Sequence, residues 1–478
     1  MNIKIKATVS ASVVLLAAAI SMQYVHAQED APVVVRPKAA DVKVNPARQA
    51  EANSLGTTLT KMGANPKGNA AGTIPPYTGT TLGAPKDIAY KGTGTYYPNP
   101  YPNEKPLFVI DGTNWEKYKA NLSDGQIALF KKYPKTFKMK VFPSKRDVRY
   151  DDRLYASVKG NAATAELVPS GNGVQNAFGG PPFPIPKTGV EAIWNHEYSA
   201  QPMLTEGVVA SGAVFSNGSI SMRKEFESRY FQLFDPALTY KTFDGILAKV
   251  FVEVTDPPRE KGKITLVHEY MDLTEIPRNA WQYLPGTRRV RRAPTIAYDF
   301  PDGPGGLRTV DDAQGFIGAT DRYDWKLEPM REVYIPYNSY EMDSPSHKYT
   351  DILTVNHPNP EYMRYELHRV WVVEAKLKEG KRHVYSKRRM YLDEDSWAGA
   401  LFDNYDSQGN LWRVTMRPLF NAYDMPGITG RLEIYHDLDK GAYMINGMVN
   451  EEGGPPAVPK QKRPEDYYTP ANVRKVGK

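Results

Sequence analysis

The residues with the greatest capacity for chemistry lie in one block, from position 285 to 338. The block holds four arginines between 288 and 292, followed by six aspartates: Asp299, Asp302, Asp311, Asp312, Asp321 and Asp324. Two carboxylates placed across a sugar are sufficient to cleave a glycoside. Local roles compete with that chemistry, because Asp302 stands in a Gly/Pro turn and Thr309 has the spacing of a capping box with Asp312. We therefore predict no catalytic residue.

The arginine cluster has a defined geometry if it forms a strand. Alternation would place Arg289 and Arg291 on one face and Arg288 and Arg292 on the other. One pair could then contact an anionic head group, since arginine binds phosphate or carboxylate in a bidentate manner. Ion pairs with the aspartates of the same block are the simpler interpretation.

Metal and cofactor chemistry lack their sequence motifs. His196-Glu197 and His268-Glu269 begin like the helix of a zinc protease, but neither has a second histidine four residues after the first. The chain contains 8 His and no Cys, which excludes disulfides, thiol catalysis and thiolate metal sites. There is no nucleophile elbow, phosphate-binding loop or dinucleotide fingerprint. We expect neither a metal nor a cofactor.

Residues 1–27 read as a secretory signal peptide. Lys4 and Lys6 precede an apolar run at 13–20, which is too short to span a bilayer, and Val-His-Ala at 25–27 forms the cleavage site. Removing this segment lowers the formal charge from +7 to +5, because two lysines and no acid are lost. Such a mixed surface suits at most transient contact with a membrane, and no nucleic acid. We predict a soluble periplasmic protein.

The rest of the chain divides into an arm, a long domain and a tail. Residues 28–86 are predicted to form an extended arm with one helix at 46–61. Two short helices follow at 113–121 and 123–133, the second beginning after an N-cap serine. Residues 451–478 form a charged, proline-rich tail that we expect to be loosely packed.

Strands dominate between residues 87 and 450, which we predict to be a single domain. Apolar and polar residues alternate at 264–271 and at 367–375. Residues 401–405 and 411–416 flank Asp-Ser-Gln-Gly-Asn and predict a hairpin. Strands without long intervening helices favour one broad antiparallel sheet.

Several segments resemble a family of exported Gram-negative proteins known as domain of unknown function 1329. They are GGPPFP at 179–184, RRVRRAP at 288–294, DRYDWKL at 321–327, YIPYN at 334–338, RYELHRVWVV at 364–373 and YLDEDSW at 391–397. The resemblance covers roughly residues 45 to 450. It implies an α+β, β-rich fold of the type of LolA, an outer-membrane lipoprotein-sorting protein: a large curved antiparallel sheet, an incomplete half-barrel, with helices covering its concave face.

The same resemblance implies a function without catalytic residues. Family members look like periplasmic carriers that cooperate with envelope transporters of the resistance-nodulation-division type. This chain lacks the lipidated cysteine of lipoprotein members. Burying an acyl chain of about sixteen carbons offers on the order of 12 kcal/mol before ordering costs, so an apolar cavity would suffice.

We therefore predict a carrier or chaperone for a lipid or other hydrophobic molecule. Alternatives are an envelope protein that binds or cleaves polysaccharide with paired carboxylates, and a purely structural envelope protein. The chain has 31 Tyr, 16 Phe and 7 Trp, enough large rings to line a groove. The predicted ligand-binding residues are Phe316, Tyr323, Trp325, Tyr334 and Trp371 as walls, with Arg289 and Arg291 as a head-group contact at the mouth.

Overall fold

One open, mixed sheet of 15 strands is the framework of this computed structural model, which describes residues 44–274, 276–293 and 298–477. In sheet order the strands are β1 (Phe108–Asp111), β2 (Lys138–Phe142), β14 (Tyr365–Leu377), β15 (Lys387–Asp393), β16 (Gly399–Tyr405), β17 (Leu411–Met416), β20 (Glu433–Asp437), β21 (Ala442–Met448), β5 (Leu204–Val214), β6 (Ile220–Phe231), β7 (Ile246–Asp256), β8 (Ile264–Tyr270), β9 (Asn279–Leu284) and β10 (Arg289–Arg292). β13 (Tyr323–Pro336) pairs with the other edge of β14.

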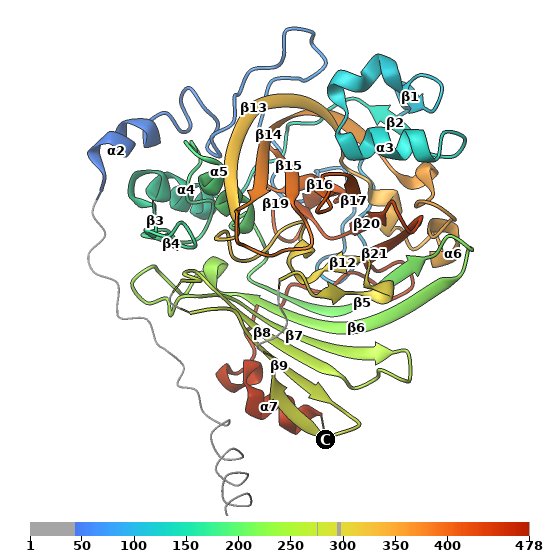
Figure 1. The fold of residues 1–478 in the computed structure, drawn as a ribbon. Coiled ribbons are helices and arrows are strands. Elements are labelled where there is room, and N and C mark those ends of the chain that lie inside the picture. Colours follow the sequence, from blue (N-terminus) through green and yellow to red (C-terminus); the bar gives the residue numbers. More distant parts are fainter. Residues whose placement is uncertain (1–43, 275, 294–297, 478) are drawn as a thin grey trace, which may run out of the picture. The chain divides into compact units, whose positions relative to one another are not determined.

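Antiparallel pairing runs without interruption from β13 through β14 to β10 (Figure 1). β2 joins β14 in parallel at Tyr365 and Glu366, which is the one departure from the antiparallel sheet we expected. Three two-stranded pairs lie outside this sheet: β3 (Glu166–Leu167) with β4 (Val174–Gln175), β11 (Pro301–Asp302) with β12 (Arg308–Thr309), and β18 (Leu419–Ala422) with β19 (Gly427–Gly430). The β-rich fold with one large incomplete sheet is confirmed.

Helices are short and few among the described residues. The α-helices are α2 (Pro46–Ala52), α3 (Asp124–Lys132), α4 (Asp152–Thr164), α5 (Gly189–Glu197), α6 (Tyr349–Ile352) and α7 (Pro470–Val476). The 3₁₀ helices are η1 (Trp115–Asn121), η2 (Gln232–Phe234), η3 (Pro304–Gly306), η4 (Val310–Asp312), η5 (Tyr340–Asp343), η6 (Pro360–Tyr362) and η7 (Glu465–Tyr468). α3 packs against β16 and β17, whereas α5 packs against β13 and β14.

Sequence patterns located several elements closely. The expected strands at 264–271 and 367–375 are β8 and β14, and the expected hairpin is β16–β17. α3 begins after Ser123, whose hydroxyl accepts a hydrogen bond from the backbone of Gln126 in a complete capping box. The helix expected at 46–61 ends at Ala52, because the chain turns into a series of tight loops there.

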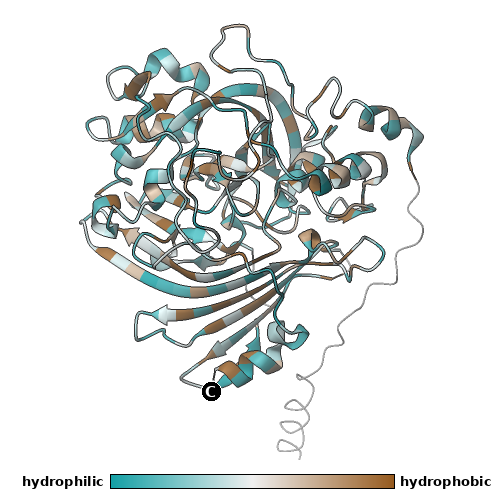
Figure 2. Ribbon diagram, turned by 180° about the vertical axis from the view of Figure 1, so that it is seen from behind, coloured by the Kyte–Doolittle hydropathy of each residue, from teal (hydrophilic) through white to brown (hydrophobic). Residues whose placement is uncertain are grey.

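The strands from β5 to β9 present two different faces. Even-numbered residues of β6, such as Phe226 and Tyr230, pack with Tyr467, Tyr468 and Val473 of the C-terminal tail. Tyr468 and Val473 are buried, so the expectation of a loosely packed tail was wrong. Figure 1 shows α7 next to β8 and β9, on the side of the sheet that the tail covers. Figure 2 shows polar and apolar bands alternating along the strands. The odd-numbered residues of β6 point to the other side.

The predicted signal peptide at 1–27 lies outside the described residues. Within the described ranges, no helix is long and apolar enough to cross a membrane.

Candidate functional site

A cavity of about 220 Å³ lies between the sheet face of β5–β8 and a segment at residues 302–318, which we call the roof segment. Figure 1 shows β12, part of this segment, lying over β5 and β6. The sheet contributes alternate residues of β6, β7 and β8, because successive side chains of a strand point to opposite faces. The floor is made of Ser211, Arg223, Glu225, Glu227, Arg229, Phe231, Leu247, Ala248, Val250, Val252, Thr265, Val267 and Glu269.

The β6 part of the floor is charged and internally paired. Arg223 Nη2 lies 2.6 Å from Glu225 Oε1. Arg229 holds both oxygens of Glu227, at 2.8 and 2.9 Å. Burial raises the pKa of Glu225, although the Arg223 guanidinium opposes that shift. Each arginine thus pairs with a carboxylate two residues away on its own strand, while Arg223 Nε is buried without a hydrogen-bond partner among the described residues.

The β7 part of the floor is apolar, whereas β8 contributes the apolar Val267 and the polar Thr265 and Glu269. Leu247, Val250 and Val252 line the β7 part, and Ile317 of the roof segment faces the same cavity. This wall can accept a hydrocarbon group, since each buried methylene contributes about 0.8 kcal/mol. The cavity is therefore amphipathic: apolar side chains of β7 and Val267 lie between the charged residues of β6 and the Glu269–Arg278 pair.

Ion pairs and glycines hold the roof segment in place. Arg308 Nη2 lies 2.7 Å from Asp302 Oδ2, and its Nη1 lies 3.2 Å from Glu433 Oε2 on β20. The backbone N–H of Gln314 donates to Glu433 Oε1 at 2.7 Å. Gly318 has φ +114°, and a Cβ there would lie 2.4 Å from the Tyr298 ring. The segment thus depends on contacts with strands far away in sequence.

Glu197, the last residue of α5, brings a carboxyl into the cavity without an arginine partner. Its Oε1 is buried and has no hydrogen-bond partner among the described residues. Burial raises the pKa of Glu197 well above its usual value, although a hydrogen bond from the Gly318 backbone opposes the shift. Burial therefore favours the neutral form of this carboxyl.

The preceding residue fixes the position of Glu197. His196 Nε2 donates to the Gln314 carbonyl at 3.1 Å, and its Nδ1 accepts from the Gly399 backbone at 3.0 Å. This pattern defines the neutral tautomer, and burial lowers the pKa of His196 to about 3. His196 is a structural histidine that anchors the end of α5.

A second cavity of about 110 Å³ adjoins the first. The two share Glu227, Arg229, Phe231, Gln314 and Asn446 as lining residues. Together they reach the lower end of the range of roughly 300–1,000 Å³ that small-molecule pockets occupy. The space suits one small amphiphile or one segment of a larger one.

None of the seven predicted ligand-binding residues lines either cavity. The five aromatics lie instead in the packed core: Phe316 against Trp325 at 5.1 Å, Tyr323 against Trp325 at 5.8 Å, Tyr334 against Phe108 at 6.0 Å, and Trp371 stacked on Trp397 at 5.1 Å. Phe316 belongs to one core cluster, against which Trp325 and Trp371 pack, and Tyr334 belongs to another. Ile317, the neighbour of Phe316, faces the cavity instead.

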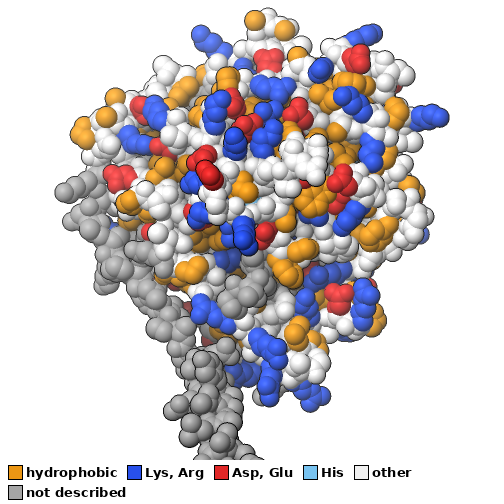
Figure 3. Space-filling model, viewed as in Figure 1, with side chains coloured by type: hydrophobic (Ala, Val, Ile, Leu, Met, Phe, Trp, Pro, Cys, Tyr) orange, Lys and Arg blue, Asp and Glu red, His pale blue; other side chains and the backbone are white. Residues whose placement is uncertain are grey.

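Arg289 and Arg291 are exposed on the edge strand β10. No ion pair joins them to a carboxylate within the described ranges, so the expected pairing with aspartates of the same block is wrong. Asp311 and Asp312 pair with Arg388, at 2.6 and 3.1 Å. Figure 3 shows Lys and Arg side chains gathered in the lower part of the molecule as viewed there, where β9 and α7 lie.

The charged floor of the cavity was missed, although its pattern is visible in the sequence. Residues 225–230 alternate charged with apolar or neutral side chains, and Arg223 lies on the same face as Glu225, Glu227 and Arg229. That alternation is also typical of a strand with one face in water. Only the roof segment turns this face into a cavity wall.

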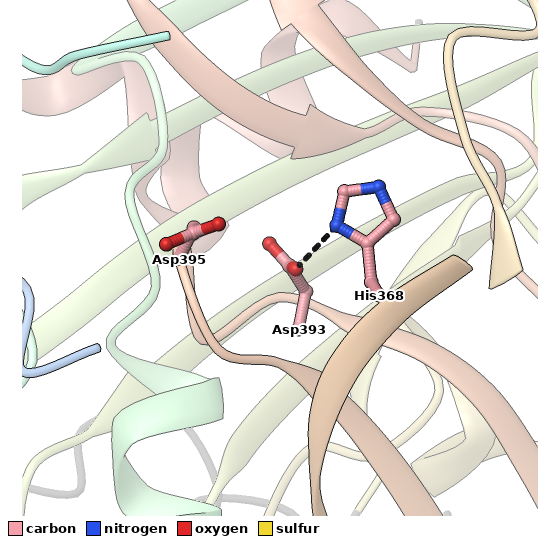
Figure 4. A group of neighbouring side chains, drawn as sticks. All are labelled: His368, Asp393 and Asp395. Carbon is pink, nitrogen blue, oxygen red and sulfur yellow. Dashed lines mark ion pairs between the residues drawn. The ribbon is translucent and has the colours of Figure 1, made fainter. Parts of the chain in front are cut away.

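His368, Asp393 and Asp395 form the group of described residues whose geometry most resembles a metal site (Figure 4). Arg146 already holds both oxygens of Asp395, at 2.7 and 2.8 Å. Burial disfavours the charge on His368, but its contacts with Asp393 and Glu366 outweigh burial and raise its pKa to about 9. His368 Nδ1 lies 3.5 Å from Asp393 Oδ1, so the three side chains form a buried ion network with Arg146 in this structure.

Comparisons with known proteins agree on one family. Residues 109–474 match the family described as protein of unknown function, DUF1329. The uncharacterized protein PA3922 of Pseudomonas aeruginosa is 41% identical over 446 residues, which is 89% of this chain and 93% of that protein.

Solved structures resemble the chain more distantly. A DUF1329 family protein from Desulfovibrio piger is 14% identical, with a TM-score of 0.41 over 60% of this chain and 97% of that one. A domain described as a putative outer membrane lipoprotein-sorting protein from Vibrio parahaemolyticus is 13% identical, with a TM-score of 0.40 over 59% of this chain and 97% of that one.

Proposed function

This chain belongs to the DUF1329 family of proteins of unknown function, and we propose that it is a periplasmic carrier or chaperone for a lipid or other hydrophobic molecule. The observation that supports this proposal is the amphipathic cavity, whose apolar wall is formed by β7 and Val267. A binding cavity with a few polar groups beside apolar side chains is the usual form of a small-molecule site.

The paired charges of the cavity support binding over catalysis. All its carboxylates except Glu197 lie within 3 Å of an arginine: Glu225, Glu227, Glu269 and Asp302. A glycoside-cleaving enzyme needs one free nucleophile or base besides its acid. The carrier proposal requires no such group, since its free energy comes from burying the ligand.

Delivery of the ligand is the second part of the proposal. The exposed Arg289 and Arg291 on β10 offer transient contact with anionic lipid head groups, which attract arginine at a membrane surface. The acceptor would be an envelope transporter of the resistance-nodulation-division type. This partner follows from the family resemblance and from no contact within the chain.

Extraction of the purified protein tests the carrier proposal. Organic extracts analysed by mass spectrometry should contain a co-purified amphiphile in about one equivalent. Val250→Trp should place an indole ring in the cavity and remove most of the co-purified amphiphile, because Val250 lines the cavity. Val355→Trp is the matched control, since Val355 is 48% exposed. Empty extracts from the wild type, or equal loading of both variants, would contradict the proposal.

A further inference from the structure

Basic residues gather where the last strand of the sheet, β10, meets the C-terminal helix α7. α7 contacts β8, β9 and β10, so these segments lie side by side. Residues 279–293 and 470–477 contain no acid and six basic residues, all exposed, which we call the basic edge: Arg288, Arg289, Arg291, Arg292, Arg474 and Lys475. The formal net charge of the whole chain is +7, so the remainder of the chain is close to neutral.

The four arginines of the basic edge at 288–292 have no carboxylate partner among the residues that the structure describes. Arg292 donates a hydrogen bond to Asn279 Oδ1, which is uncharged. Other exposed cations of the C-terminal tail do find acids: Lys462 lies 2.7 Å from Asp235, and Arg463 lies 2.7 Å from Glu206. The guanidinium groups at 288–292 therefore remain available to an external anion, to which arginine donates in a bidentate manner.

Strand pairing places part of the basic edge on the cavity face of the sheet. Arg291 pairs with Gln282 of β9, and Gln282 pairs with Thr265 of β8, which lines the larger cavity. Residues directly opposite on paired strands point to the same face. Neighbouring strands lie about 4.8 Å apart, so Arg291 is roughly 10 Å from Thr265 along the sheet. The basic edge is thus two strands away from the cavity floor.

The remaining cations lie on the opposite face. Arg292 pairs with Trp281, which packs against the same core cluster as Val473 of α7. The positive charge therefore surrounds the free edge of β10 and is not collected in one concave site. A single small anion could contact only a part of it, and a folded protein would need fixed carboxylates on both sides of the edge. Laterally mobile lipid head groups can meet all of these charges.

From this arrangement we propose that the basic edge docks on the surface of an anionic phospholipid bilayer, with β10 toward the head groups. The inference rests on the proposed carrier function and deepens its delivery step, because docking by this edge brings the bilayer to the end of the sheet next to the cavity floor. Val476, which follows Lys475, is 45% exposed and offers an apolar side chain to the same interface.

Flotation with vesicles tests the docking surface. The purified protein without its predicted signal peptide should bind vesicles of equal parts dioleoylphosphatidylglycerol and dioleoylphosphatidylcholine at low ionic strength. Binding to pure dioleoylphosphatidylcholine should be at least about ten-fold weaker. About 1 M NaCl should release the protein, since the Debye length is then about 3 Å. Comparable binding to both kinds of vesicle, or binding to neither, would overturn the inference.

A triple variant locates the contact. Arg288→Gln, Arg289→Gln and Arg291→Gln combined should weaken binding at least about thirty-fold, because each basic residue near an anionic surface contributes about five-fold. Lys117→Gln, Lys119→Gln and Lys135→Gln combined are the matched control. They remove the same charge from exposed positions in or near η1, which contacts β1 and β13. An equal loss in the two variants would mean that net charge alone decides, and would overturn the assignment to β10.

A fluorescent reporter gives the orientation directly. The chain contains no cysteine, so a single introduced thiol carries one nitrobenzoxadiazole dye. The dye on Thr287→Cys, in the exposed turn before β10, should brighten and shift to the blue on phosphatidylglycerol vesicles. The dye on Ala120→Cys, exposed on η1, should not change. A response at Ala120→Cys alone, or at both positions, would contradict docking by this edge.

Failure of the carrier proposal has a different appearance. In that case organic extracts of the protein are empty, whereas vesicle binding is measured without any ligand in the cavity. Loaded extracts without vesicle binding overturn only the docking surface.

Discussion

Two halves of the same sheet bury charge in different ways. In the core half, formed by β13–β17, β20 and β21, Arg146 contacts Asp395, Glu394 and backbone carbonyls of the N-terminal arm. In the cavity half, formed by β5–β10, each arginine of β6 pairs with a carboxylate two residues away on its own strand. The core network joins distant segments, whereas the cavity pairs stabilise only a surface that a ligand can meet.

The buried charges have different structural roles in the two halves of the sheet. Arg146 and Glu394 have side chains only 1% exposed, and Arg369 adds a 2.7 Å bond to Glu394 while holding the carbonyls of Asn65 and Lys67. The arm is thereby attached to the sheet. In the cavity half, Glu197 Oε1, Arg223 Nε and Arg278 Nη1 are buried without hydrogen-bond partners among the described residues.

Breaking the core network should have the largest effect. Arg146→Leu leaves Asp395 and Glu394 buried without their main partner, and we expect a loss of about 3–5 kcal/mol in the free energy of unfolding. Denaturant unfolding measures it. Arg149→Leu is the matched control, because its partner Asp152 is 80% exposed and such pairs contribute about 0–1 kcal/mol. Equal losses in both variants would erase the distinction between a buried network and a surface pair.

The core half should contribute a decline in stability as the pH rises. His368 has a folded pKa of about 9 against an ordinary 6.5, so its stabilisation is complete below pH 6.5 and is lost as pH rises through 9. The contribution of His368 to the free energy of unfolding is on the order of 3 kcal/mol. Burial raises the pKa of Glu394 to about 8, so the free energy of unfolding also falls as the pH rises toward 8 and this carboxyl loses its proton. Unfolding curves measured between pH 6 and 9.5 should show this decline.

Substitution of His368 isolates its share of the decline. His368→Gln should flatten the curve between pH 6.5 and 9. His436→Gln should leave that region unchanged, because burial lowers the pKa of His436 to about 3 and its contribution changes only at acid pH. An unchanged slope in His368→Gln would mean that other groups carry the dependence.

Breaking an ion pair in the cavity should lower the free energy of unfolding less than breaking the core network around Arg146. Arg229→Leu frees Glu227 in a cavity where water can hydrate the carboxylate, so we expect a loss of about 1–3 kcal/mol, below that of Arg146→Leu. Adding Glu227→Gln to Arg229→Leu should restore part of the loss, because no unpaired charge then remains. A cost equal to that of Arg146→Leu would show that the cavity half is as tightly packed as the core half.

Predictions from the sequence succeeded where a few neighbouring residues decide the outcome. The hairpin β16–β17 follows from its turn residues, and α3 follows from Ser123 and Gln126. The site was harder to predict, because aromatic content points equally to a core and to a cavity. Phe316, Tyr323 and Trp325 pack on one another in the core, while small aliphatic residues such as Val250 line the cavity.

Alternation, capping and composition therefore determined the β-rich architecture and the exclusion of thiol chemistry, and the resemblance of short segments indicated the family, because each depends on residue types or on spacing within one segment. Only the tertiary structure decided where the cavity lies and which acid it leaves unpaired. Glu197, the β6 floor and the roof segment at 302–318 are far apart in sequence and meet through long-range packing. A polar strand face reads the same in sequence whether water or another part of the chain covers it.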